Sequence, residues 1–193
     1  MFAGHFGVAG IVKAWRPGIP MAALLVASQA PDLVFAPLSV MGLESLDPAE
    51  PGLSGYGSLL ITAPFSHSLV SNVILAVVVG SLVHLFLRRR WGPDAGWVLG
   101  GVVFSHWLLD LLVHRPDMHV LPGDVGGLPL LGLGLWELPV AAAVVEGALV
   151  VAGTVLYGWR VSRDLPDRRR AWAYGAGVGA LLVGSFVFDL LAS

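Results

Sequence analysis

The chain has 193 residues, of which 56% are hydrophobic and only 12% are charged, and its mean hydropathy is +0.79. Soluble domains carry roughly 25% charged residues, so this composition predicts an integral membrane protein formed by a single domain over residues 1–193. A net charge of −2, without a basic patch or a phosphate-binding loop, excludes a nucleic-acid partner. The absence of cysteine excludes disulfides, thiolate metal ligands and a cysteine nucleophile.

The N-terminal part of the chain predicts a short helix followed by a broken span. Residues 2–14 are apolar but, at about 1.5 Å per residue, reach less than the roughly 30 Å of a bilayer core. We interpret them as a half-helix or re-entrant segment that carries His5. Residues 18–43 are long enough to span, and Pro31 within them loosens the helix immediately before Asp32.

The rest of the chain predicts further spans, giving an all-α, polytopic transmembrane bundle of about five spanning helices. The predicted spans are residues 59–87, 95–114, 128–157 and 171–191. The first of these holds His67 in its first third, and the third holds Glu137. Two turn-rich polar segments, residues 44–58 and 115–127, predict the loops between them.

The basic residues predict the orientation of the bundle. Placing the loops at 13–16, 88–94 and 160–170 on one side gathers ten of the eleven Lys and Arg residues there and leaves Arg115 opposite. That side is predicted to be cytoplasmic, because basic residues concentrate in cytoplasmic loops.

A polar ridge runs along the predicted span at residues 95–114. His106, Asp110 and His114 are spaced four apart, so they lie on one face of a helix. Ionisable side chains at membrane depth cost a few kcal/mol each, so this ridge should have partners elsewhere in the chain. Counting from the loops places six polar residues in one depth band: His5, Asp32, His67, His106, Asp110 and Glu137. The shared depth favours one common site over a local hydrogen-bonded network, which is the alternative reading of the ridge.

Histidine and carboxylate together are the ligands of a borderline divalent metal. Zn²⁺ is the first choice, with Mn²⁺ or Fe²⁺ as alternatives. Such an ion makes buried Asp32 and Asp110 tolerable and lowers the pKa of a bound water to about 7, which begins metal-assisted ester or phosphoester hydrolysis. Glu137 is the first candidate for moving protons, with His114 or His119 as alternatives. Glu146 is predicted to be a helix contact or a protonated core residue, and Asp189 to lie near the outer surface.

The order of these motifs resembles the bacterial and archaeal membrane-bound metal-dependent hydrolases of the YdjM type, described as LexA-binding and inner-membrane-associated. The motifs are His5, Pro31-Asp32, Ser66-His67-Ser68 and His106-x-x-x-Asp110, within residues 1 to about 115. The resemblance implies a prokaryotic inner membrane and a metal site formed by His5, Asp32, His67, His106 and Asp110. Two features depart from the family pattern. Leu33 follows Asp32 where members often carry a second acid, which argues against two metals, and Ala63-Pro64-Phe65 replaces a His-Arg-Gly stretch.

Three functions are therefore compared. The first is a metal-dependent hydrolase that acts on an ester or phosphoester bond of a lipid or amphiphile, since the site lies within reach of the membrane. The second is a metal-ion or proton transporter that uses the same cluster as a transit site. The third is a membrane scaffold, in which the polar cluster could be replaced without loss of function.

Overall fold

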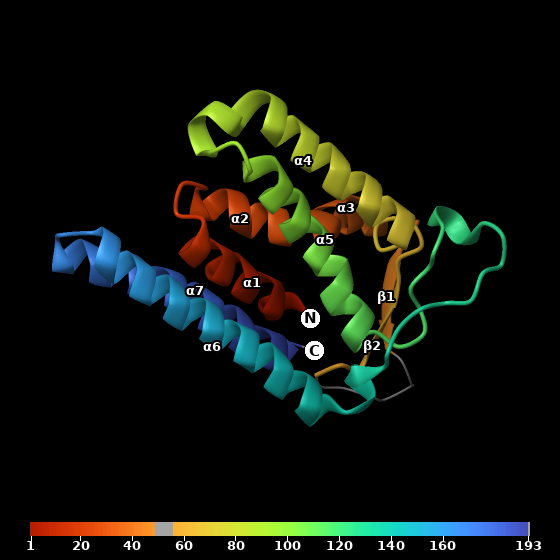
Figure 1. Ribbon diagram of the computed structural model, residues 1–193. Coiled ribbons are helices and arrows are strands. Elements are labelled where there is room, and N and C mark those ends of the chain that lie inside the picture. The colour runs from red at the N-terminus through yellow and green to blue at the C-terminus, as the bar shows by residue number, and fades with distance from the viewer. Residues whose placement is uncertain (49–55, 193) are drawn as a thin grey trace.

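The computed structural model describes residues 1–48 and 56–192 and is mostly helical (Figure 1). Within those residues four helices are long and apolar enough to cross a membrane: α4 (Leu69–Trp91), α5 (Ala95–Val113), α6 (Pro139–Asp164) and α7 (Arg168–Ala192). Two shorter helices, α2 (Met21–Ser28) and α3 (Ala30–Val40), form a bent pair that counts as a fifth span. The helical membrane bundle predicted from the sequence is confirmed, and the chain is a candidate integral membrane protein.

The short N-terminal helix α1 (Phe2–Trp15) lies inside the bundle, between the α6/α7 pair and α2 (Figure 1). Glycines let it approach α6 closely. A Cβ atom added at Gly7 would lie 2.5 Å from the Leu149 carbonyl oxygen, and one added at Gly153 would lie 2.4 Å from the Gly7 carbonyl oxygen. Because neither position has room for a side chain, the backbones of α1 and α6 are in direct contact.

The break between α2 and α3 is the predicted one, and the two helices bend by 51°. Pro31 near the start of α3 has no N–H to continue the ladder from α2, and it disfavours helical geometry in the residue before it. The side chain of Gln29 at the break donates a hydrogen bond to the Phe2 carbonyl oxygen over 3.0 Å. Asp32 therefore sits in the first turn of a new helix, where the helix dipole favours a negative charge.

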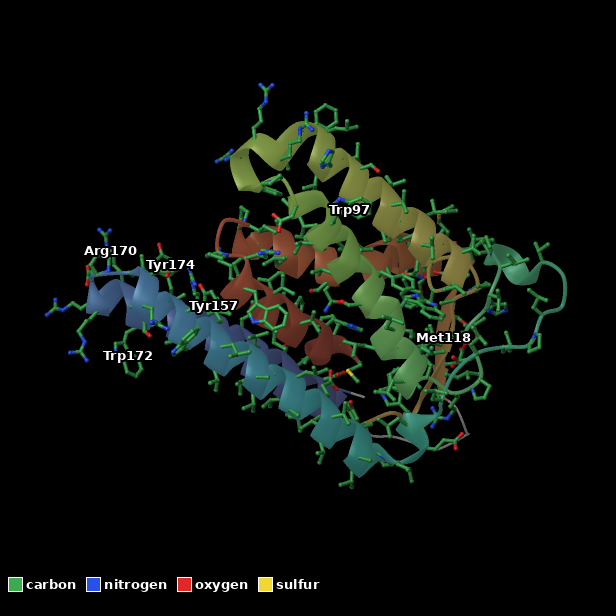
Figure 2. The ribbon with its side chains drawn as sticks, in the orientation of Figure 1. Trp97, Met118, Tyr157, Arg170, Trp172 and Tyr174 are labelled. Carbon is green, nitrogen blue, oxygen red and sulfur yellow. The ribbon has the colours of Figure 1, made fainter. Side chains whose placement is uncertain are left out.

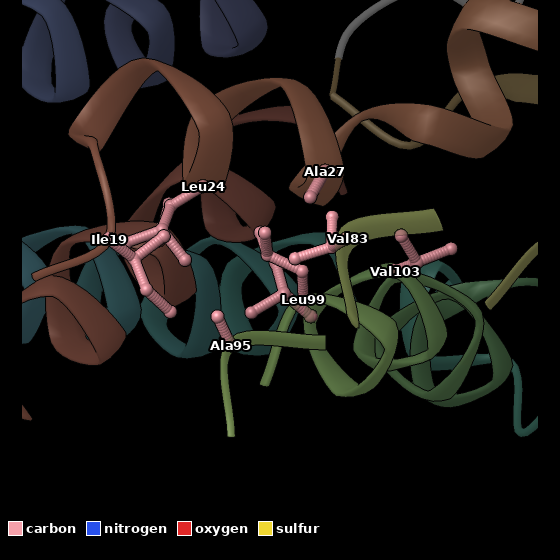
Figure 3. Packing of buried hydrophobic residues seen from close by; sticks show 9 residues of the cluster. Ile19, Leu24, Ala27, Val83, Ala95, Leu99 and Val103 are labelled. Carbon is pink, nitrogen blue, oxygen red and sulfur yellow. The ribbon is translucent and has the colours of Figure 1, made fainter. Parts of the chain in front are cut away.

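An apolar core joins α2 to α4 and α5 (Figure 3). Leu24 and Ala27 of α2 are buried against Leu99 and Val103 of α5, and Ile19 closes the cluster near the turn before α2. Lipid tails are as apolar as these side chains, so close packing, not exclusion from lipid, holds the helices together. This core fixes α5, which carries the polar ridge, against the broken helix that carries Asp32.

Two short strands lie where the sequence predicts a loop and the start of a spanning helix. β1 (Ser45–Pro48) pairs antiparallel with β2 (Leu59–Thr62), with Ser45 opposite Thr62. The prediction of one helix over residues 59–87 is therefore wrong at its start, since α4 begins at Leu69. Residues 44–48 of the predicted loop include a strand, and residues 49–55 of that loop lie outside the described residues.

The predicted span over residues 128–157 is also wrong at its start, because α6 begins at Pro139. Gly126, Gly127, Gly132 and Gly134 all have positive φ, which interrupts a right-handed helix. One short 3₁₀ turn, η1 (Pro122–Asp124), lies in the loop before this predicted span, and a second, η2 (Leu135–Glu137), lies in its first part. Glu137 is thus placed on η2, before the membrane-length helix.

Aromatic and basic side chains gather at the end of α7 that lies far from the hairpin. Arg170, Trp172 and Tyr174 project there from the helix surface, while Met118 lies at the opposite, hairpin end (Figure 2). The Trp172 and Tyr174 side chains are exposed. Such side chains are typical of the level of lipid headgroups, so this end fits a membrane–water interface.

Candidate metal centre

The five residues predicted to bind metal converge in space. They come from α1, α3, the turn before α4, and α5: His5, Asp32, His67, His106 and Asp110. One potential ligand atom from each of His5, His106 and Asp110 lies within 4.8 Å of the others, and the same holds for Asp32, His67 and His106. All but Asp32 are buried, and the side chain of Asp32 is 34% exposed. The protein thus contains a buried His/Asp cluster that could hold a metal ion.

The spacing within the cluster fits ligands around one small cation. His106 Nε2 lies 3.0 Å from Asp110 Oδ2 and 3.6 Å from Asp32 Oδ1. His67 Nε2 lies 3.4 Å from Asp32 Oδ1, and His5 Nε2 lies 3.2 Å from Asp110 Oδ1. Ligand atoms about 2.0–2.1 Å from a tetrahedral Zn²⁺ are about 3.3–3.4 Å apart. The measured separations, 3.0–3.6 Å, lie around this value, as expected for groups that can approach one ion.

His106 has the proton arrangement that a metal ligand needs. Its Nδ1 lies 2.8 Å from the Ser28 carbonyl oxygen, and a carbonyl only accepts, so Nδ1 donates and, in the neutral ring, Nε2 holds the lone pair. His106 Nε2 is buried and has no hydrogen-bond partner among residues 1–48 and 56–192, although Asp110 is 3.0 Å away. The carboxylate therefore lies off the direction of the lone pair. A fixed outer nitrogen with a free inner nitrogen is the usual arrangement of metal-binding histidines.

His67 is held in a turn that the surrounding helices fix. The side chain of Asn72 donates to the carbonyl oxygens of Ser66 and Ser68 over 2.9 and 3.0 Å. Trp107 Nε1 donates to the His67 carbonyl oxygen over 3.0 Å. Ser68 also caps α4, because its hydroxyl accepts from a backbone N–H of the first turn. These contacts place the His67 ring without any regular secondary structure at that residue.

His5 reaches the cluster from α1. Its ring stacks on that of His106 with a centroid separation of 3.7 Å and an interplanar angle of 13°. Two stacked imidazolium cations would repel each other, so the pair favours at least one neutral ring. The α-amino nitrogen of Met1 lies 3.6 Å from Asp110 Oδ1, on the same side as His5.

A cavity of about 510 Å³ gives access to the cluster. His5, Asp32, His67 and Asp110 form a polar part of its wall. Much of the remaining wall is apolar and comes from α3, the hairpin and α7: Phe35, Ala36, Leu46, Leu59, Ile61 and Phe188. The site can therefore receive a molecule that has both a polar group and a hydrocarbon part.

The three predicted proton-transfer candidates are placed differently, and His119 is not among the residues that line the cavity. His114 is buried and lines the cavity, and its Nδ1 lies 2.9 Å from Asp117 Oδ1. Glu137 is exposed on η2 and is not among the residues that line the cavity. The prediction that Glu137 lies within a spanning helix is wrong, because the glycine-rich segment before Pro139 keeps it outside α6.

A second polar group lies beside the cavity. Glu146 is fully buried where α6 meets α1, as expected for a helix-contact residue, and accepts from the Gly4 N–H over 2.7 Å and from the Tyr56 hydroxyl. Burial and this carboxylate raise the pKa of Tyr56. Asp189, expected near the outer surface, lines the cavity and accepts from the Phe2 N–H over 3.3 Å.

Three contributors to the cluster were not predicted from the sequence. The Ser28 carbonyl orients His106, Asp117 partners His114, and Glu44 lies behind the turn that carries His67. Asp117 follows His114 by three residues, so that pair has a local signal. Glu44 and Ser28 are distant in sequence from their partners, so no local sequence signal points to them.

No family model, curated protein or solved structure matches this chain. The resemblance to the YdjM-type hydrolases stays a prediction, and the function is inferred from the geometry of the cluster.

Proposed function

We propose that this protein is a membrane-embedded, metal-dependent hydrolase that acts on an ester or phosphoester bond of a lipid or another amphiphile. The observation that supports it is the convergence of five His and Asp side chains at one end of a largely apolar cavity. A purely structural hydrogen-bond network would direct its nitrogens at its carboxylates. His5 Nε2 does point at Asp110 Oδ1, over 3.2 Å, but His106 Nε2 has no hydrogen-bond partner among the described residues although it lies among the ligand atoms of the cluster.

The ligand set favours Zn²⁺, with Mn²⁺ or Fe²⁺ as alternatives. Imidazole and carboxylate suit all three ions, and the chain has no cysteine to select a softer one. His5, His67, His106, Asp32 and Asp110 would hold the ion. When bound, the metal lowers the pKa of a coordinated water to about 7 and so supplies a nucleophile at neutral pH.

The chain's own residues supply orientation, proton transfer and exclusion of water. A carboxylate only accepts, so Asp117 holds a proton on His114 Nδ1 and leaves His114 Nε2 free to take up a proton. The apolar side chains of the cavity wall, among them Phe35 and Phe188, would bind a hydrocarbon chain and keep bulk water away from the cluster. Asp32, the most exposed member of the cluster, is the one that an incoming polar group meets first.

The metal content of the protein purified in detergent tests this proposal. Wild type should contain about one equivalent of a divalent metal, and His106→Ala and Asp110→Ala should lose it. His84→Ala is the matched control, because His84 lies in a groove between α4 and α5 away from the cluster. Equally little metal in wild type and in all three variants would overturn the metal site and the hydrolase with it.

A transporter that uses the same cluster is the second candidate, and the bend of 51° between α2 and α3 favours it. Broken helices with an acid at the break, here Asp32, form ion sites in secondary transporters. Zinc and proton flux should be measured in liposomes with wild type and Asp32→Asn. Flux that Asp32→Asn abolishes, without any hydrolysis of phospholipid or fluorogenic esters, would favour transport over hydrolysis.

A further inference from the structure

Glu44 is a buried acid that contacts the turn before α4 and none of the metal-ligand candidates directly. Glu44 lies between α3 and β1 along the chain, and its side chain is buried. Oε1 accepts from the backbone N–H groups of Phe65 and Ser66 over 2.9 and 2.8 Å, and Oε2 accepts from the Ser66 hydroxyl over 2.7 Å. Three donors are aimed at this one carboxyl group, so in all of these contacts Glu44 is the acceptor.

These contacts set the direction of a hydrogen-bond chain that ends at the cluster. The Ser66 hydroxyl has one proton, and this proton points at Glu44. Ser66 Oγ therefore presents lone pairs to His67 Nδ1, which is 2.7 Å away, so Nδ1 carries the ring proton. His67 Nε2 then holds the lone pair, and this nitrogen lies 3.4 Å from Asp32 Oδ1 in the cluster.

We propose that Glu44 is a positioning residue that acts through Ser66 to hold His67 in the Nδ1–H tautomer and so supplies the cluster with an imidazole lone pair beside that of His106. This inference rests on the metal site of the proposed function. Glu44 thereby joins the residues that shape the metal site, although it lies 23 positions before His67 in the sequence. His106 obtains the same tautomer from a backbone carbonyl, which a substitution cannot remove, whereas His67 depends on side chains that can be changed.

Glu44→Gln separates this role from a structural one. The glutamine carbonyl oxygen can take the place of Oε1 and accept from the backbone N–H groups of Phe65 and Ser66. Two N–H donors at that position favour the amide oxygen over the NH₂ group. The glutamine NH₂ then faces Ser66 and donates to it. The Ser66 hydroxyl must turn its proton towards His67 Nδ1, which places the ring proton on Nε2. The turn is preserved while the tautomer inverts.

Long-range ¹H–¹⁵N NMR of histidine-labelled, metal-free, full-length protein in detergent reads the tautomer directly, with His67→Gln to assign the signal. We expect Nδ1–H in wild type and Nε2–H in Glu44→Gln, and a zinc affinity about 10- to 100-fold weaker in the variant, the usual effect of changing an outer-shell partner. Asp47→Asn is the matched control, an acid-to-amide change on an exposed strand residue. It should leave both readouts unchanged.

Ser66 variants test whether Glu44 acts on His67 through the Ser66 hydroxyl. Ser66→Thr keeps the hydroxyl and should keep wild-type zinc affinity. Ser66→Ala removes the relay, so adding Glu44→Gln to it should weaken zinc binding no further. Two results would overturn the role of Glu44 and leave the metal site intact. One is an equal loss of zinc affinity when Glu44→Gln is added to wild type and to Ser66→Ala. The other is a Glu44→Gln protein that binds zinc and keeps the Nδ1–H tautomer of His67. Inversion of the tautomer in a protein that binds no zinc would support the relay and overturn the metal site.

Discussion

Replacing Gly153 by alanine should push α1 away from α6 and displace His5 from the cluster. The new Cβ would lie 2.4 Å from the Gly7 carbonyl oxygen, a backbone atom that no rotamer change can move. Reaching an ordinary van der Waals distance requires the two helices to separate by about 1 Å. His5 lies two residues from Gly7, within the same helical turn, so it moves with that backbone.

The size of the effect follows from opposing contributions. Overpacking at a close contact costs about 1–3 kcal/mol of unfolding free energy. Alanine in a helix interior stabilises the folded protein by up to about 1 kcal/mol relative to glycine, because its helix propensity is higher. The net loss of stability should therefore be about 0–3 kcal/mol. Zinc affinity should fall about 10-fold or more, because one of the ligands no longer reaches the others.

Gly158→Ala is the control on the same helix. A Cβ at Gly158 meets nothing within 4 Å, so this variant should match wild type or gain up to about 1 kcal/mol. Thermal unfolding in detergent, followed by circular dichroism, gives the stability, and competition with a chelator gives the zinc affinity. If the two glycine variants unfold alike and both bind zinc as wild type does, direct contact between the α1 and α6 backbones is not what positions His5.

Three further predictions test other parts of the site. His114→Gln should keep its zinc but lower the rate of hydrolysis about 100-fold or more, measured on a fluorogenic ester; an unchanged rate removes His114 from proton transfer. Saturating zinc at 100 times its dissociation constant should stabilise wild type by about 2.7 kcal/mol in thermal unfolding, an increment that His106→Ala should lack. Tyr56→Phe should cost about 1–3 kcal/mol by leaving Glu146 without its hydroxyl donor. Because the pKa of Tyr56 is raised, this difference should persist below pH about 10 and shrink above it, and the opposite pH dependence would contradict the contact.

The sequence allows the membrane bundle and the members of the cluster to be predicted because both depend on local patterns. A spacing of four places His106 and Asp110 on one face of α5, and an apolar length of about 20 residues predicts a spanning helix. Pro31 marks the break in the second span for an equally local reason. Counting depth from the loops then groups residues from different helices.

The parts that could not be predicted depend on contacts between distant segments. The apolar run from Leu59 to Thr62 suits a helix or a strand, and its pairing with Ser45–Pro48 decides for the strand. Glu44 reaches Ser66 only because that hairpin brings the two together. The sequence predicts Glu137 within a helix because the apolar stretch over residues 128–157 is long enough for one, whereas Gly132 and Gly134 have positive φ values that interrupt a helix there.

The zinc K-edge X-ray absorption spectrum of the metal-loaded protein tests the central claim most directly. A site formed by His5, His67, His106 and the two aspartates predicts nitrogen and oxygen ligands at about 2.0–2.1 Å, with the multiple scattering of several imidazole rings. His106→Ala should reduce the imidazole contribution. A spectrum of hydrated zinc without imidazole scattering, unchanged in His106→Ala, would contradict the account.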